Sequence, residues 1–507
     1  MTWSFLAWSP DDSAGAVYDV TVPGVWEELV AFYAAGDRSR PLERIVTIAR
    51  EHGVRSVVVE QRHLDPDWRS EHAAFHGQLF RRRPSVCHRW HLFTDDVPAD
   101  LSRLRPEAYR GYAVLRPLPS TPVGRTMIAP PPGLDGAVRC EATERLSLFG
   151  HPLWITAMPF LSQDAEYLRC AHAVLWMVLR HAHLAHGLPR HLTAQVHDAA
   201  LGGVIVGRQV PSEGLSVQQM LAGATQLGLS PGLMHLPVTP DEDAAADAAP
   251  DPADAPVDAD GRADPQTGRL SLRAVLCRYV NSQLPPLVIS SSHAWVVVAY
   301  RRDPAQDRRV TLWRHDDARG PYLEVDDPFA EAEDAHRPWQ TAILPLLPAI
   351  YVTAERAEAA GRLWFAGYLR RAADDEPVAH AAAAGELTFR TYAVRTDHFL
   401  EGLAARGVDP ALADLYRLAA LPEHLWVVEA VDRAERRAGR PDVVGEALLD
   451  ATSSTHHEPL QEGLVALHGG RLAHRVGPDH GTRRDLHLAD PGHYRTGRPG
   501  RGGVGPS

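Results

Sequence analysis

The chain has 507 residues, of which 45% are apolar and 23% charged, as is typical of a soluble globular protein with several cores. Its 52 basic residues are all arginine, and the net charge is −12. Residues 241–264 hold nine acidic side chains and one arginine, which contribute −8, so the rest of the chain carries only −4. This balance argues against the basic surface that nucleic-acid binding requires.

The cysteines and the N-terminus indicate the compartment. Cys87, Cys140, Cys170 and Cys277 lie far apart and form no CxxC pair, which favours a reducing environment. Residues 1–12 lack the basic segment of a signal peptide, and no apolar run approaches the 18 residues of a membrane span. We therefore expect a cytoplasmic protein that does not bind a membrane.

Residues 1–135 predict an accessory α/β region. Apolar spacing indicates helices at 25–35 and 42–52, and the run from 55 to 60 is typical of a buried strand. The proline-rich stretch 117–132 predicts the boundary to the next region.

Residues 136–350 form a second predicted region. Its apolar residues from Leu168 to Leu179 recur at helical spacing, and a later helix is expected to be capped by Ser216 and to end at Gly228. Residues 238–268 are rich in Asp, Ala and Pro and lack aromatic residues, so we expect a disordered acidic insert.

Residues 351–475 predict a C-terminal α/β region, and the tail at 476–507 is expected to be disordered. Glu446 and Asp450 are four residues apart on a predicted strand, where they would share one face. They could serve as acid and base, but the favoured interpretation is a solvated face.

Cys170 opens the apolar helix of the second region. Backbone dipoles at a helix N-terminus favour the thiolate form, and Arg169 acts in the same direction. Asp164, in the polar lead-in, is a candidate cap for this helix. A cysteine in an apolar helix also fits a small buried hydrophobe, so the functional interpretation depends on the rest of the chain.

Four features follow one another in an order that suits thiol catalysis. They are Gln163, Cys170, His293 at the start of the strand run 294–300, and Asp327 before a proline at the end of a later strand. An imidazole takes the thiol proton and later protonates the leaving amine, while a carboxylate orients the imidazole. A side-chain amide can stabilise the oxyanion.

In these motifs the sequence resembles the papain-like cysteine peptidases, closest to the bacterial branch that processes double-glycine leader peptides. The resemblance implies an α+β catalytic domain over 136–350. It further implies Cys170 as nucleophile, His293 as general base and acid, Asp327 as orienting carboxylate and Gln163 as oxyanion donor. Asp326 competes with Asp327 for the orienting role, because neighbouring strand residues face opposite ways.

The expected activity is therefore cysteine-dependent hydrolysis of an amide in a peptide or protein, through a thioester and without a cofactor. Cys87, His88 and His91 are potential metal ligands, but we see no second half of a zinc site, so no metal is expected. Two alternatives stay open. The same triad could serve a thiol acyltransferase or deamidase, or the domain could be an inactive papain-like binding scaffold.

Overall fold

A computed structural model describes most of the chain in two compact units. The described residues are 15–34, 38–98, 100–118, 120–202, 214–235, 272–290, 293–302, 310–325, 341–369, 377–408, 410–438, 442–453, 463–467 and 472–476. The first unit comprises Met1–Leu236, Leu284–Arg301 and Thr311–Pro345, and the second comprises Pro237–Gln283, Arg302–Val310 and Leu346–Ser507. The predicted insert and nearly all of the predicted tail lie outside the described residues.

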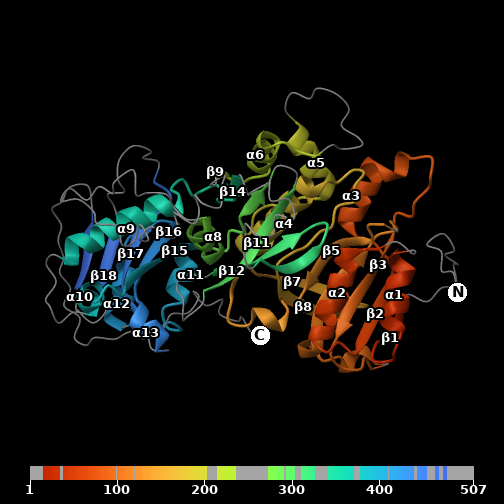
Figure 1. Cartoon of the computed structure of the whole chain (residues 1–507), viewed down its shortest axis with the longest axis horizontal. Coiled ribbons are helices and arrows are strands. Elements are labelled where there is room, and N and C mark those ends of the chain that lie inside the picture. Colours follow the sequence, from red (N-terminus) through yellow and green to blue (C-terminus); the bar gives the residue numbers. More distant parts are fainter. Residues whose placement is uncertain are drawn as a thin grey trace. The chain divides into compact units, whose positions relative to one another are not determined.

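The first unit begins with a five-stranded antiparallel sheet whose strands follow chain order (Figure 1). Its strands are β1 Gly15–Asp19, β2 Ser56–His63, β3 Cys87–Phe93, β4 Tyr109–Leu115 and β5 Val123–Ile128. The intervening helices are α1 Val25–Ala34, α2 Arg40–Glu51, α3 Pro66–Ala74, and the 3₁₀ turns η1 His76–Gln78, η2 Leu101–Arg103 and η3 Pro106–Ala108.

A hairpin closes the core of this sheet. After η4 Pro132–Leu134 and β6 Val138–Arg139, strands β7 Ala142–Leu148 and β8 His151–Ala157 pair along their whole length. Leu148, Leu153 and Ile155 of the hairpin pack against Tyr112 and Met127 of the sheet. Burial of these side chains holds the hairpin in place.

The chain then forms three helices and a second sheet. The helices are α4 Cys170–His186, α5 Thr193–Leu201 and α6 Val217–Gln226. The sheet has the order β13-β12-β11-β10-β14-β9, and β6 also pairs with β11. Its strands are β9 Gly232–His235, β10 Leu287–Ile289, β11 Ala294–Arg302, β12 Val310–Asp316, β13 Gly320–Val325 and β14 Thr341–Leu344. The pairs β10–β11, β10–β14, β12–β13 and β9–β14 are antiparallel.

The predicted boundary near residue 135 does not coincide with a boundary between the compact units. Strand β5 lies within the proline-rich stretch 117–132 and completes the first sheet. Helix α2 packs against β13, and Arg44 of α2 donates hydrogen bonds to the carbonyls of Pro321 and Tyr322, at 3.2 and 2.9 Å. The N-terminal region and the region of Cys170 therefore form one unit.

The second unit contains another five-stranded antiparallel sheet in chain order (Figure 1). Its strands are β15 Leu387–Arg395, β16 His424–Asp432, β17 Val443–Asp450, β18 Gly463–Leu467 and β19 Leu472–Val476. Its helices are α8 Leu272–Asn281, α9 Ala354–Leu369, α10 Pro377–Ala383, α11 Thr396–Glu401, α12 Pro410–Leu418 and α13 Arg433–Arg437. Helix α9 packs on β15, β16 and β17.

The expectation that Glu446 lies on a solvated face is wrong. Glu446 is fully buried, accepts a hydrogen bond from the Tyr416 hydroxyl, and lies 3.4 Å from the Arg406 guanidinium. Asp450 instead accepts hydrogen bonds from the amide and hydroxyl of Thr452 at the end of β17. Glu446 is therefore part of a buried ion network and not of a surface face.

Among the residues that the structure describes, no helix combines the length and the apolar character needed to cross a membrane. The described fold is of the mixed α+β kind, with several antiparallel sheets.

Candidate functional site

Cys170 is the first residue of α4, and it is the most accessible cysteine of the chain. Cys87, Cys140 and Cys277 are buried, whereas Cys170 is half-buried; all four lie in the described parts. Every residue of the helix from Ala171 to Ala182 is buried, and most of them are apolar, which fixes the helix axis within the unit. The apolar spacing therefore places one thiol at the N-terminal end of a rigid helix.

The α4 N-terminus is capped differently from the sequence-based expectation. The N-cap is Arg169, whose amide donates to Nδ1 of His172 at 3.4 Å. Asp164 caps the preceding turn instead. His172 is buried, and its Nε2 lies 3.1 Å from Nδ1 of His197. Burial, and to a lesser extent the charge of His197, lowers the pKa of His172 to about 3. His172 is thus a neutral structural side chain.

His293 lies in the turn between β10 and β11. The amide of Ser290 donates to the His293 carbonyl at 2.9 Å, and the His293 amide donates to the Ser290 hydroxyl oxygen at 3.2 Å. The buried strand residues that follow, Ala294 to Tyr300, anchor β11 in the sheet. The two hydrogen bonds with Ser290 and the buried strand thus fix the backbone of His293.

The structure places the Cys170 thiol beside the His293 imidazole, near enough to contribute to the raised pKa of that ring. The other side of the imidazole faces two carboxylates, because Nε2 lies 3.2 Å from Oδ1 of Asp316 and 3.7 Å from Oδ1 of Asp317. The His293 side chain is 27% exposed, whereas Asp316 and Asp317 are 2% and 0% exposed. Since Asp316 occupies Nε2, Nδ1 is the ring nitrogen left for the thiol.

The charges around His293 favour its protonated form. Burial lowers the pKa of His293, but hydrogen bonds to Asp316 and Cys170 and the charges of both aspartates outweigh it and raise the pKa to about 10. Burial opposes the ionisation of Asp316, yet the hydrogen bond and charge of His293 hold its pKa below the usual range. The imidazole and Asp316 therefore form an ion pair at neutral pH.

Asp317 differs from Asp316 although the two are adjacent. Two backbone amides, from Ala318 and Arg319, donate to Oδ1 of Asp316 at 3.0 Å each, whereas neither carboxylate oxygen of Asp317 has a hydrogen bond of ordinary geometry. Burial raises the pKa of Asp317 to about 7, with His293 opposing this effect and Asp316 adding to it. Asp317 thus carries a proton part of the time near neutral pH.

Sequence reasoning missed these two carboxylates. Strand β12 ends in Asp316 and is followed by Asp317, just as the predicted strand before Asp327 ends in two aspartates. A register shift between Arg314 and Asp316 changes the pairing with β13 at this point, and Asp317 lies beyond the strand. Both side chains can therefore face one imidazole. The sequence feature that could have identified them is that Asp316 and Asp317 form the first Asp-Asp pair after the strand that follows His293.

The other two predicted site residues are only partly placed. Asp327, like its competitor Asp326, lies outside the described residues, so its orienting role stays a prediction. Gln163 is half-buried in the loop before α4, and its backbone carbonyl accepts a hydrogen bond from Arg116 at 3.3 Å. Its role as oxyanion donor also stays a prediction.

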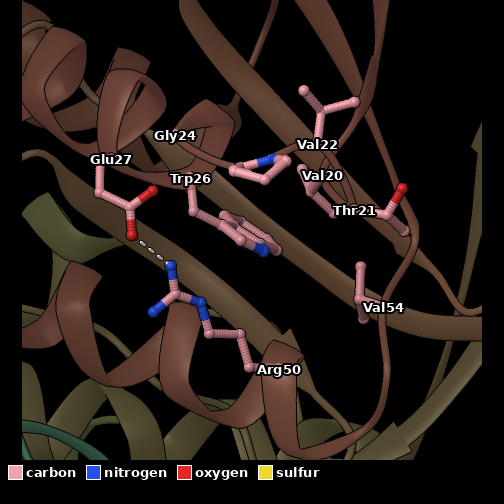
Figure 2. A pocket seen from close by; sticks show the side chains of 9 residues that line it. Val20, Thr21, Val22, Gly24, Trp26, Glu27, Arg50 and Val54 are labelled. Carbon is pink, nitrogen blue, oxygen red and sulfur yellow. Dashed lines mark hydrogen bonds and ion pairs between the residues drawn. The ribbon is translucent and has the colours of Figure 1, made fainter.

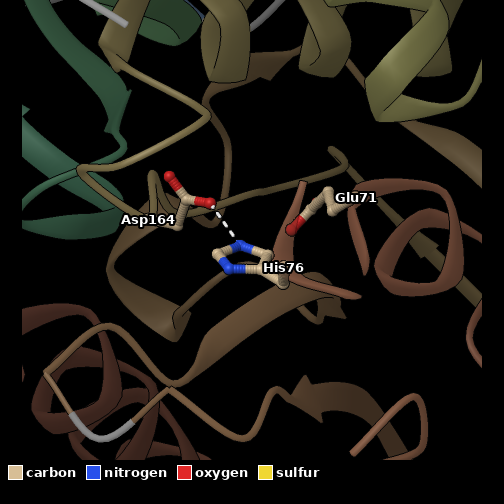
Figure 3. Close-up of side chains that lie close together, drawn as sticks. All are labelled: Glu71, His76 and Asp164. Carbon is tan, nitrogen blue, oxygen red and sulfur yellow. Dashed lines mark hydrogen bonds and ion pairs between the residues drawn. The ribbon is translucent and has the colours of Figure 1, made fainter. Parts of the chain in front are cut away.

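A second histidine cluster lies in the same unit, and Figure 3 shows its three members, Glu71, His76 and Asp164. His76 is fully buried, and its Nε2 lies 3.0 Å from Oδ2 of Asp164. Arg116 bonds Glu71 at 3.0 Å. Burial raises the pKa of Glu71 to about 8; the Arg116 charge opposes this shift, and the neighbouring acids add to it. This cluster is part of a buried ion network.

Each of the two histidine clusters brings one imidazole and two carboxylates close enough to bind a metal ion together. A structural zinc site takes four ligands, and each cluster offers three side chains. In the first cluster, Arg116 already bonds Glu71, and Arg83 already bonds the second ring nitrogen of His76.

Two of the potential metal ligands named from the sequence bond tyrosines instead. His88 bonds the Tyr33 hydroxyl at 2.7 Å, and His91 bonds the Tyr109 hydroxyl at 3.0 Å.

The structure also has a cavity of about 540 Å³ at the edge of the first sheet, shown in Figure 2. Trp26 and Val54 line it, and Glu27 and Arg50 pair at 2.6 Å on its wall. None of the predicted site residues lines this cavity.

Comparison of the chain with protein-family models and with curated protein sequences finds no match.

Proposed function

We propose that the protein is a cysteine-dependent amide hydrolase of the papain-like kind, with Cys170 as nucleophile and His293 as general base and acid. One observation carries the proposal: the only partly exposed thiol among the four cysteines contacts an imidazole whose opposite nitrogen is held by a buried carboxylate. Asp316 takes the orienting role in this proposal. The resemblance of the sequence to papain-like peptidases adds a peptide or protein as the substrate.

In the acylation step, the thiol proton already resides on His293, and the thiolate sulfur of Cys170 forms a bond to the carbonyl carbon of an amide. The tetrahedral intermediate collapses when the C–N bond breaks and the imidazolium gives its proton to the leaving amine. Asp316 favours the imidazolium that exists before this proton transfer. The products of this step are a free amine and a thioester on Cys170.

In the second step, His293 takes a proton from water, and the resulting hydroxide attacks the thioester carbon. The C–S bond breaks and releases a carboxylic acid, and the thiol is regenerated. The backbone amide of Cys170 suits the oxyanion in both steps, because the first amide of an α-helix has no acceptor within the helix. The Gln163 side chain would provide the second donor.

Two other functions use the same residues. An acyltransferase would pass the thioester to an amine in place of water, and the mass of the product separates the outcomes, since hydrolysis adds one water and transfer adds the acceptor. A binding scaffold would need no reactive thiol. The contact between Cys170 and His293 favours catalysis over a scaffold.

The proposal is tested by the rate of iodoacetamide labelling at each cysteine from pH 4 to 9, read by peptide mass spectrometry. We expect Cys170 to react fastest and to stay reactive at acidic pH, because its partner His293 is protonated there. His293→Ala should slow labelling of Cys170 at pH 6 by about tenfold or more, since the sulfur loses the positive charge beside it.

His183→Ala is the matched control. Like His293, His183 is a half-buried histidine. It lies on α4, the helix of Cys170, but in the last turn, where it bonds the Leu188 carbonyl at 2.7 Å. The control should label as the wild type does. Equal labelling of Cys170 in wild type and His293→Ala would overturn the catalytic proposal and favour the scaffold.

A further inference from the structure

Asp164 stabilises the loop before Cys170, Ser162–Leu168, through hydrogen bonds to the backbone of the same loop. Oδ1 of Asp164 accepts hydrogen bonds from the backbone amides of Glu166, Tyr167 and Leu168, at 2.9, 2.8 and 2.7 Å. The Asp164 amide in turn donates to the Leu168 carbonyl at 3.1 Å. This compact turn ends two residues before Cys170, so its position sets where α4 begins.

The other carboxylate oxygen of Asp164 is held from the N-terminal region (Figure 3). Oδ2 accepts from Nε2 of His76 at 3.0 Å, and Nδ1 of His76 lies 2.5 Å from the Arg83 guanidinium. A guanidinium can only donate, so Nδ1 is the acceptor and Nε2 carries the proton that goes to Asp164. Arg83 also bonds both carboxylate oxygens of Glu166, at 3.2 and 3.1 Å.

Arg116, which follows β4, holds the start of the same loop. One of its nitrogens donates to the carbonyls of Ser162 and Gln163, at 3.0 and 3.3 Å, and the other donates to Glu71 of α3 at 3.0 Å. The Arg116 side chain is 1% exposed. Buried guanidinium bonds of this kind fix a backbone segment because a lost partner cannot be replaced by water.

The loop is also tied to the turn that carries the carboxylates facing His293. The Ser162 hydroxyl donates to the Asp317 carbonyl at 2.8 Å, and that carbonyl belongs to the turn after β12. The segment Ser162–Leu168 therefore has the N-terminal region on one side and the carboxylates facing His293 on the other. Displacement of this segment would change the distance between the thiol and the imidazole.

We propose that Arg116 and His76 are positioning residues for Cys170, and that the N-terminal region completes the catalytic unit by holding the loop Ser162–Leu168. This inference rests on the proposed function. It gives a role to residues 1–135, which the sequence left without one. The rate of a catalysed reaction depends strongly on the distances between the reacting groups. A mutation far from the reacting atoms that misplaces them by about 1 Å can therefore lower the rate about a hundredfold.

The experiment compares His76→Leu, His76→Gln and Arg116→Met with the control Arg89→Met in the full-length protein. Arg89 is a buried arginine of the same sheet that bonds the Glu60 carboxylate and the Ser147 carbonyl, and both of these partners lie outside the loop. His76→Gln keeps an amide donor for Asp164, whereas His76→Leu removes it.

Two readouts are measured on folded protein: the pH profile of Cys170 labelling and hydrogen exchange of the amides of Glu166, Tyr167 and Leu168. We expect His76→Leu and Arg116→Met to slow labelling at pH 6 by about tenfold or more, and to speed exchange of these amides. His76→Gln should recover part of both effects. Arg89→Met should keep the wild-type pH profile even where its melting temperature falls.

The inference is overturned if His293→Ala slows Cys170 labelling while His76→Leu and Arg116→Met leave both the profile and the amide exchange unchanged. It is also overturned if Arg89→Met changes the profile as much as they do, because the loop would then have no special role. If His293→Ala has no effect on labelling, the proposed function fails. Amide exchange in the loop still reports whether His76 and Arg116 hold it.

Discussion

The first unit contains two clusters of the same composition, each with one histidine and two carboxylates, and they differ in what the second ring nitrogen contacts. His76 is fully buried, and both of its nitrogens bond protein side chains that carry charge. His293 is 27% exposed, and beside its aspartates it contacts a thiol. A histidine–carboxylate pair is therefore a candidate for catalysis because of its accessibility and its reactive neighbour, and not because of the pair itself.

The largest expected difference between the clusters is in stability. Arg116→Met leaves the buried carboxyl of Glu71 without its partner, and we expect the free energy of unfolding to fall by about 3–5 kcal/mol. Urea unfolding followed by fluorescence measures the loss. The double variant Glu71→Leu with Arg116→Met should recover part of it, since no buried carboxyl is then left without a partner. A loss below about 1 kcal/mol would show that Arg116 does not anchor this cluster.

The next effect concerns Asp317, and here a substitution should stabilise the protein. Its folded-state pKa of about 7 lies above the ordinary value of 3.8. The folded state therefore binds a proton that the unfolded state has released, and the stabilisation that this provides is lost as the pH rises from about 4 to 7. Asp317→Asn removes this loss. We expect it to be more stable than wild type at pH 8 by about 1–3 kcal/mol, with the difference shrinking toward pH 4. Urea unfolding at both pH values checks the sign, and a difference that grows toward pH 4 would contradict it.

Asp316 should matter more for reactivity than Asp317. Asp316 is nearer to Nε2 of His293, at 3.2 against 3.7 Å, and its charge is held by two backbone amides. Asp316→Ala should lower the labelling rate of Cys170 at pH 6 by about tenfold, because the imidazolium loses the carboxylate that orients it beside the thiol. Asp317→Ala should have a smaller effect. The reverse order would assign the orienting role to Asp317.

The smallest expected effect is the pH dependence of stability from His293. Its pKa is raised to about 10 from 6.5, so the stabilisation that it provides is complete below pH 6.5 and is lost as the pH rises toward 10. The stability of wild type relative to His293→Ala should therefore decrease over that range, by about 1 kcal/mol because solvent screens the partly exposed ring. An unchanged difference between pH 6 and 9.5 would contradict a raised pKa.

The sequence alone determined the local elements of this protein. Ser216 caps α6 as expected, accepting a hydrogen bond from the Gln219 amide at 3.2 Å, and Gly228 follows that helix with φ +94°. The strand predicted after His293 and the apolar helix after Cys170 also form where expected. These features depend on side chains within a few residues of one another, so propensity and periodicity suffice to predict them.

Only the tertiary structure decided which distant groups meet. No local pattern tells that Asp316 and Asp317 face the imidazole, because a register shift and the turn after β12 orient their side chains. Nor does any pattern join Arg116 and His76 to the loop before Cys170, since their partners are 46 and 88 residues away in the chain. Burial fixes such contacts, because a charged group removed from water requires a partner wherever the fold brings one.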